Sequence, residues 1–218
     1  RLLKHGKALQ HLDLSMNHLS EDSLIRLAAA LPVNSKLQTL GLFHTDLRCK
    51  GKALSALLAK LPHLHWLNIG GNRLSENDLK FVMLSLGTHQ HIRGLDLSFS
   101  DLDDEGLRVM GPWLSQAPEL VRLVVHHNLI TDKGAKVLTD ELKYSKTLHT
   151  VAINNNLLTE KSVPGFKQLF NEVPTLVNLF VFDNHIGSHA FSHLAATSLE
   201  LDRLTVIARN DQQNTAIF

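Results

Sequence analysis

Histidine is the residue type in this sequence whose number and spacing could support chemistry. The chain has 14 histidines, and His185, His189 and His193 follow one another at intervals of four residues. Histidines at that spacing on a helix can hold a transition metal, but a zinc site needs a third or fourth ligand. No H-E-x-x-H motif or pair of cysteines supplies one. We therefore interpret these histidines as a solvated helix face and predict no bound metal.

Nucleophilic and acid–base chemistry also lack a complete set of residues. Cys49, the single cysteine, has no base beside it in the sequence that would activate its thiol. Asp13 and Asp96 occupy one position of the repeat described below, but they lie three repeats apart, about 15 Å, which is too far for paired acid–base work. The sequence thus predicts a protein that is not an enzyme and binds no cofactor.

Composition narrows the class of protein further. The 218 residues are 44% hydrophobic and 20% charged, which is typical of a globular chain. Lys and Arg number 22 against 21 Asp and Glu, so the net charge of +1 argues against a nucleic-acid partner. No apolar run reaches the ~18–20 residues that a membrane span requires. With one cysteine and no disulfide, we expect an intracellular, cytoplasmic protein.

A leucine-rich string, L-x-x-L-x-L-x-x-N-x-L, recurs along the whole chain. The ninth position is Asn in five copies, Thr45 or Ser100 in two others, and Arg209 in a degraded last copy. The copies begin at residues 9, 37, 64, 92, 120, 148, 176 and 201. Apolar residues at alternating positions predict a short strand with one face in the core, and the Asn side chain can bond backbone groups in the turn that follows.

The second half of each period predicts a helix. A capping residue and an acid, such as Ser20-Glu21 or Ser75-Glu76, precede apolar residues at helical spacing. Gly111-Pro112 predicts a shortened or kinked helix in the fourth period, because proline lacks a backbone N–H. One strand and one helix every ~28 residues cannot bury an apolar face alone, whereas stacked copies can.

This pattern resembles the ribonuclease-inhibitor-like class of leucine-rich repeats. The resemblance implies an α/β solenoid, or horseshoe, with parallel strands on the concave face and helices on the convex face. We expect residues 1–218 to form one such domain, with about seven full repeats, an irregular terminal repeat, and an origin in a longer protein. The scarcity of cysteine is also similar to arrays in bacterial effectors delivered to host cells and in immune receptors.

The side chains between the leucines are the candidates for contact with a partner. Positions three, five, seven and eight should point out of the concave sheet or lie at its edge, about 5 Å from the equivalent residue of the next repeat. One cluster gathers aromatic residues in the first repeats, and a second, with flanking charges, gathers near the C-terminus. The predicted contact residues are Phe43, His44, Trp66, Asp96, Phe99, Arg122, Val124, His126, His127, Phe180, Phe182, Asp183, Arg203 and Ile207.

Exposed Trp, Phe and Arg dominate binding energy at protein interfaces. The sequence therefore predicts a monomeric protein–protein interaction module that binds another protein through its concave face. Two alternatives stay open by resemblance alone. One is a regulator of a small GTPase, as among GTPase-activating members of this repeat type. The other is an RNA-binding array, against which the near-zero net charge argues.

Overall fold

The computed structural model describes residues 8–32, 35–201, 205–210 and 214–217, with side chains described as far as residue 197. Its described strands form one sheet in which sequence order and spatial order are the same. Strands β1 to β8 pair in parallel, and β8 pairs with β9 antiparallel. The strands are β1 His11–Asp13, β2 Thr39–Gly41, β3 Trp66–Asn68, β4 Gly94–Asp96, β5 Arg122–Val124, β6 Thr150–Ala152, β7 Asn178–Phe180, β8 Thr205–Asn210 and β9 Asn214–Ile217.

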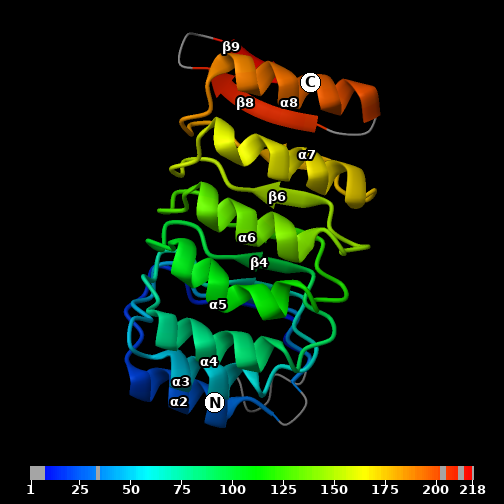
Figure 1. Cartoon of the computed structure of the whole chain (residues 1–218). Helices are drawn as coiled ribbons and strands as arrows, with labels where there is room; N and C mark the ends of the chain where they lie inside the picture. The colour runs from blue at the N-terminus through cyan, green and yellow to red at the C-terminus, as the bar shows by residue number, and fades with distance from the viewer. Residues whose placement is uncertain (1–7, 33–34, 202–204, 211–213, 218) are drawn as a thin grey trace.

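The helices stack beside one another on one side of this sheet, and the two ends of the chain lie at opposite ends of the stack (Figure 1). This arrangement confirms the predicted solenoid and the position of each strand within it. The helices are α2 Glu21–Ala30, α3 Gly51–Leu58, α4 Glu76–Leu86, α5 Asp104–Leu114, α6 Asp132–Leu142, η1 Glu160–Ser162, α7 Val163–Glu172 and α8 Ser188–Leu201.

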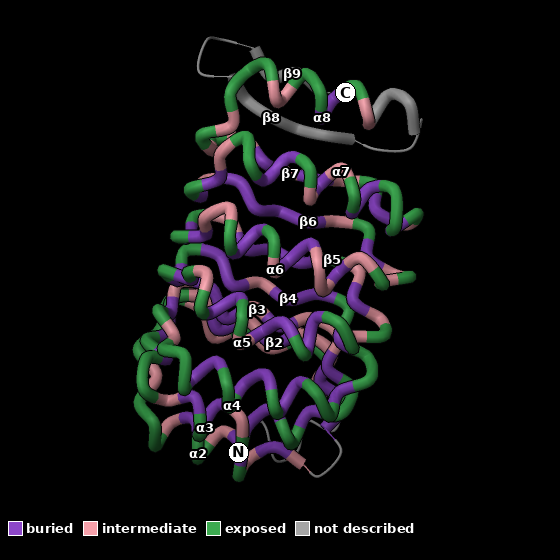
Figure 2. The backbone as a smooth tube through the Cα atoms, viewed as in Figure 1, coloured by how far each residue is buried: buried purple, intermediate pink, exposed green. Residues whose placement is uncertain are grey.

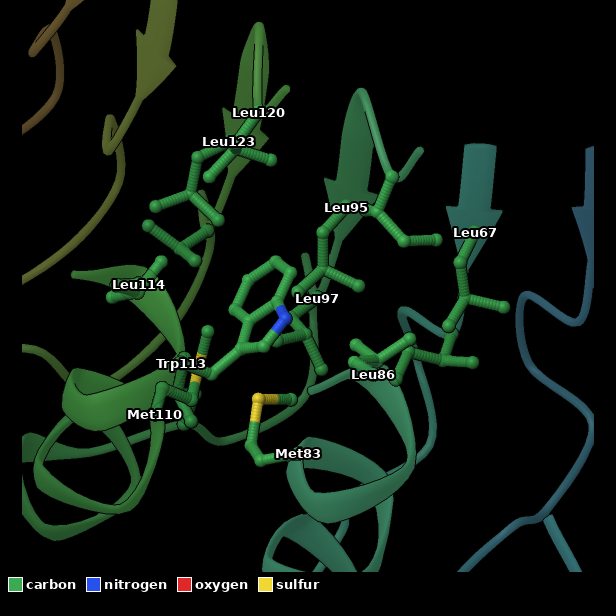
Figure 3. Packing of buried hydrophobic residues seen from close by; sticks show 14 of the residues in the cluster. Leu67, Met83, Leu86, Leu95, Leu97, Met110, Trp113, Leu114, Leu120 and Leu123 are labelled. Carbon is green, nitrogen blue, oxygen red and sulfur yellow. The ribbon is translucent and has the colours of Figure 1, made fainter. Parts of the chain in front are cut away.

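Leucine side chains from every layer merge into one continuous core between the sheet and the helices. Figure 2 shows β4 and β6 largely buried and, along the helices, buried stretches alternating with exposed ones. In Figure 3, Trp113 from α5 and Met83 from α4 point toward Leu97 and the other strand leucines. Trp113 is 6% exposed, so this indole fills the space between neighbouring helices.

The asparagine at the ninth position ties each turn to the turn of the preceding repeat. The Asn72 Oδ1 accepts hydrogen bonds from the backbone N–H groups of Thr45 and Leu47, at 2.9 and 3.2 Å. Its Nδ2 donates to the carbonyl oxygens of Leu42, Ile69 and Gly70, at 2.7 to 2.9 Å. Asn128, Asn156 and Asn184 repeat this arrangement in later layers.

Helix starts are joined between layers in a similar way. Asp78, at the start of α4, accepts hydrogen bonds from the backbone N–H groups of Cys49 and Gly51 in the preceding layer and from Ser75 in its own. Burial alone would raise the pKa of the Asp78 carboxyl, but these hydrogen bonds outweigh burial and hold that pKa below its usual value. The carboxylate therefore stays charged and replaces backbone partners that both helix starts lack.

One detail departs from the sequence-based expectations. Gly111-Pro112 was expected to shorten or kink the fourth helix; shortening was wrong, because α5 has the same 11 residues as α4 and α6, and the kink stays a prediction. Pro112 lies in the last turn, where the loss of one N–H leaves most of the helix intact.

The irregular end of the array takes the form of the β8–β9 hairpin. Among the described residues, no helix is long and apolar enough to cross a bilayer.

The asparagine contacts make a matched pair of substitutions informative. Asn72→Ala should lower the free energy of unfolding by about 3 kcal/mol, because it leaves several buried backbone groups unpaired. Asn17→Ala should cost about 1 kcal/mol or less, since Asn17 is exposed and donates only to Leu14 and Ser15 of its own turn. Urea denaturation of both variants measures the difference, and equal losses would contradict the role given to the inter-repeat bonds.

Candidate functional site

The eighth residue of each of the first seven repeats has a left-handed backbone. The φ angles at this position lie between 52° and 69° in the seven repeats from β1 to β7. Glycine, asparagine and aspartate tolerate this region best, and Gly71, Asn155 and Asp183 occupy it in three of the repeats. Larger residues adopt the same conformation at a cost of about 1–2 kcal/mol each. They are Met16, His44, Phe99 and His127, and all four side chains are exposed.

Aromatic side chains from three turns meet at this edge of the sheet, where the strands end. We call Phe43, His44, Phe99, His126 and His127 the aromatic rim. The Phe99 ring stacks on His127 with centroids 4.1 Å apart and 12° between the planes, and it meets Phe43 and His126 edge-on at 6.1 and 5.2 Å. Phe99 is 46% exposed. The sequence placed these five residues at the concave edge, and the structure brings their rings together.

His126 is the least hydrated member of the aromatic rim. Its Nδ1 is buried and has no hydrogen-bond partner. Burial lowers the pKa of the imidazole below its usual 6.5; Asp96 opposes this shift, whereas His127 and Arg122 reinforce it. His126 is therefore neutral at physiological pH, and it behaves as a polar ring held among aromatic neighbours.

Trp66 lies flat across the sheet beside the aromatic rim. A Cβ atom at Gly94, the paired residue of β4, would lie 1.9 Å from the Trp66 ring, so only glycine leaves room for the indole. The Arg122 guanidinium, one strand further on, lies 5.9 Å from the ring centroid. Trp66 is half-buried, and its outer face is free to contact another molecule.

The second predicted cluster differs from the expectation. Val124, which the sequence predicted as a contact residue, is only 3% exposed, so the expectation that it faces a partner was wrong. Ala152, the equivalent residue of the next strand, is 5% exposed. Phe180 is half-buried on β7, and Phe182 packs partly against the core. No ring contact joins them among the described residues. Arg203 and the side chain of Ile207 lie outside those residues.

The charged candidates lie around these rings. Asp96 accepts hydrogen bonds from the Ser98 N–H and hydroxyl, at 2.9 and 2.6 Å, so its carboxylate is turned toward its own strand end. Asp183 is exposed in the last described turn of this edge. The part that these residues play in contact with a partner remains a prediction.

Two depressions contain residues that the sequence pattern did not single out. One, of about 790 Å³, adjoins the aromatic rim and is lined by Met16, Arg48 and Arg73 as well as Phe43 and Phe99. Arg48 is the twelfth residue of its repeat and Arg73 the tenth, so both lie beyond the columns considered above. The other, of about 650 Å³, lies between α4 and α5 on the convex side, beside the 74% exposed Leu84.

The histidines near the C-terminus form no larger site. His189 and His193 meet edge-on on α8, with ring centroids 4.7 Å apart. Within the described ranges, no three His, Cys, Asp or Glu side chains gather closely enough to hold a metal ion. Cys49 is a free, exposed thiol.

Comparisons with known proteins agree with this architecture. Two models described as leucine-rich repeats match residues 8–28 and 88–111. A search of curated proteins finds no sequence match. The structure titled "Leiomodin-1 Actin-Binding Site 2 (ABS2)" is similar with a TM-score of 0.54 and 18% identity, covering 65% of this chain and 84% of its own. The tropomodulin C-terminal domain of Caenorhabditis elegans has a TM-score of 0.58 and 15% identity, covering 70% and 93%. The chain therefore contains leucine-rich repeats and has the α/β solenoid fold of such arrays.

The unpartnered His126 predicts a pH effect on stability. Its pKa is lowered in the folded protein, so the unfolded chain binds more protons, and the free energy of unfolding should fall as the pH drops through 6.5. His126→Phe removes this contribution and the unpaired nitrogen, and should be neutral or stabilising at pH 7.5. Urea titrations at pH 7.5 and 5.5 test this. An equal loss on acidification in both proteins would contradict it.

The close approach of Trp66 to Gly94 predicts a spectroscopic change. Gly94→Ala should displace the indole into solvent and increase quenching of tryptophan fluorescence by iodide, while the buried Trp113 stays protected. The fold should survive, because the obstacle is a side chain rather than backbone. The same substitution in a Trp66→Phe background is the control and should leave quenching unchanged. Unaltered quenching in the single variant would show that Trp66 does not lie over β4.

Proposed function

We propose that this protein is a protein–protein interaction module that contacts its partner through the aromatic rim and the adjoining Trp66–Arg122 pair. One observation carries the proposal. Exposed, bulky side chains occupy backbone positions at which asparagine or glycine would be more stable. Folding does not account for Phe99 or His127 at such positions, whereas binding does.

The chemistry of the surface fits this role. Aromatic rings and arginine supply large contact areas at interfaces, and a cluster of half-exposed rings is a better anchor than single scattered residues. The Phe99–His127 stack presents a rigid aromatic face, and the Trp66 indole extends that face onto the concave sheet. Phe180, Phe182 and Asp183 form a second contact further along the array.

The alternatives receive less support. No feature of the aromatic rim favours regulation of a small GTPase, and this alternative rests on resemblance alone. RNA binding is opposed by Asp13 and Asp96 on the concave strands and by the net charge of +1. An intracellular, monomeric protein and a bacterial effector origin remain predictions from the sequence. Because the similar leiomodin-1 structure is titled as an actin-binding site, purified actin is a defined first probe.

Substitution within the left-handed turns separates binding from folding. The double variant Phe99→Asn/His127→Asn keeps a residue type that this backbone already accepts at Asn155. It should keep the free energy of unfolding within about 1 kcal/mol of wild type, because relief of backbone strain offsets the lost ring stacking. Partner recovery in affinity capture followed by mass spectrometry should fall at least about tenfold.

Tyr144→Ala is the matched control for this experiment. Tyr144 is 72% exposed and follows α6, away from the aromatic rim, so its removal should leave partner recovery unchanged. If the double variant recovers the same partners as wild type at the same yield, the aromatic rim is not the contact surface and the proposal is wrong.

A further inference from the structure

The depression beside the aromatic rim is lined by both apolar and cationic side chains. We call it the rim depression. Its apolar lining comes from Phe43, Phe99 and Met16; the rings of Phe43 and Phe99 meet edge-on, and Met16 is 70% exposed. Its cationic lining comes from Arg48 and Arg73. At about 790 Å³, the space is large enough for a short stretch of peptide.

The carboxylates at this edge are already engaged. Asp46 pairs with the Lys50 Nζ at 3.0 Å and with the His18 Nδ1 at 3.3 Å. The Asp101 carboxylate holds the Arg73 Nε at 2.9 Å. The side chains of the His18–Asp46 and Arg73–Asp101 pairs are largely exposed, so solvent weakens these pairs, whereas the Lys50 side chain is 15% exposed. Together the three pairs engage both carboxylates.

Arg48 is a cation that takes no part in these ion pairs. It is exposed, and it has no ion-pair partner within the part of the chain that the structure describes. A planar guanidinium with free N–H groups is suited to bidentate contact with a carboxylate. An arginine without an ion-pair partner that lines the same depression as two phenylalanine rings therefore complements a ligand that carries a carboxylate next to an apolar group.

We infer that the rim depression binds an acidic peptide segment in which a large apolar side chain adjoins an aspartate or glutamate. The apolar side chain packs against Phe99 and Phe43, and the carboxylate pairs with Arg48. This inference rests on the proposed function and specifies its partner as a protein with an acidic, partly apolar segment. A nucleic acid is opposed by the net charge of only +1 of the whole chain.

A phage-displayed library of random linear peptides tests this inference with the full chain as bait. Selected peptides should be enriched in aspartate or glutamate within one or two positions of a large apolar residue. Binding of the best peptide, measured by fluorescence anisotropy, should weaken at least about tenfold in Arg48→Gln and in Phe99→Asn. It should also weaken as sodium chloride is raised, because an exposed ion pair is screened.

Arg26→Gln is the control for the loss of one positive charge. Arg26 is exposed on α2, where it pairs with Asp22, and its removal changes the net charge as Arg48→Gln does. Binding of the selected peptide should be unchanged in this variant. Equal weakening in both variants would mean that net charge, not the rim depression, attracts the peptide, and would overturn the inference.

The remaining outcomes separate this inference from the proposed function. Selection of neutral or basic peptides, or of no peptide, overturns the acidic assignment. So does a selected peptide whose binding ignores Arg48→Gln. If partner recovery is still lost in Phe99→Asn/His127→Asn, the aromatic rim remains the contact surface. If that recovery is also unaffected, both the proposed function and the inference fail.

Discussion

The hydrogen bonds of the ninth-position asparagine are the interaction on which the rest of the structure depends. Each of the strands β1 to β7 is only three residues long, too short to fix the path of the chain by its own pairing. The asparagine amide links the repeats instead. Its oxygen accepts hydrogen bonds from backbone N–H groups of the preceding repeat, while its nitrogen donates hydrogen bonds to carbonyl groups of both repeats. The Asn128 Oδ1 accepts from Ser100 and Leu102, and its Nδ2 donates to Leu97 and Val125. Adjacent turns are thereby held in register, and the leucines beneath them pack as layers.

The same bonds explain how bulky residues tolerate a left-handed backbone at the eighth position. Two turns lack an asparagine of their own, those with Thr45 and Ser100, and each is held by the amide of the following repeat. These are the turns that carry His44 and Phe99. A conformation that is locally unfavourable persists when the surrounding structure specifies it from outside. Stability supplied by the core and the amides is therefore available to maintain an exposed aromatic surface.

The sequence predicted the fold in detail and the site in part. Strand positions followed from the spacing of leucines, since a fixed period leaves one register that buries every apolar face. The contact surface was harder to predict, because the pattern indicates which way a side chain points but not whether neighbouring side chains cover it. Trp66 and Val124 were both expected to face outward; the indole is half-exposed over Gly94, whereas the smaller valine is buried. Arg48 was missed because it follows the string, where the turn returns it to the same edge.

The distribution of residues at the eighth position also divides the array along its length. Asn155 and Asp183 sit in the later turns, where the backbone strain is small, while Phe99 and His127 sit in the middle turns, where it is larger. A solenoid built only for stability would carry the less strained residues throughout, since each layer meets nearly the same neighbours. Met16 in the first turn has the same left-handed backbone without a ring, but the turns that carry His44, Phe99 and His127 are joined by ring contacts. Because rings from these three turns meet, the aromatic rim is best understood as one surface maintained across several repeats, and the later repeats as the scaffold that extends the sheet beside it.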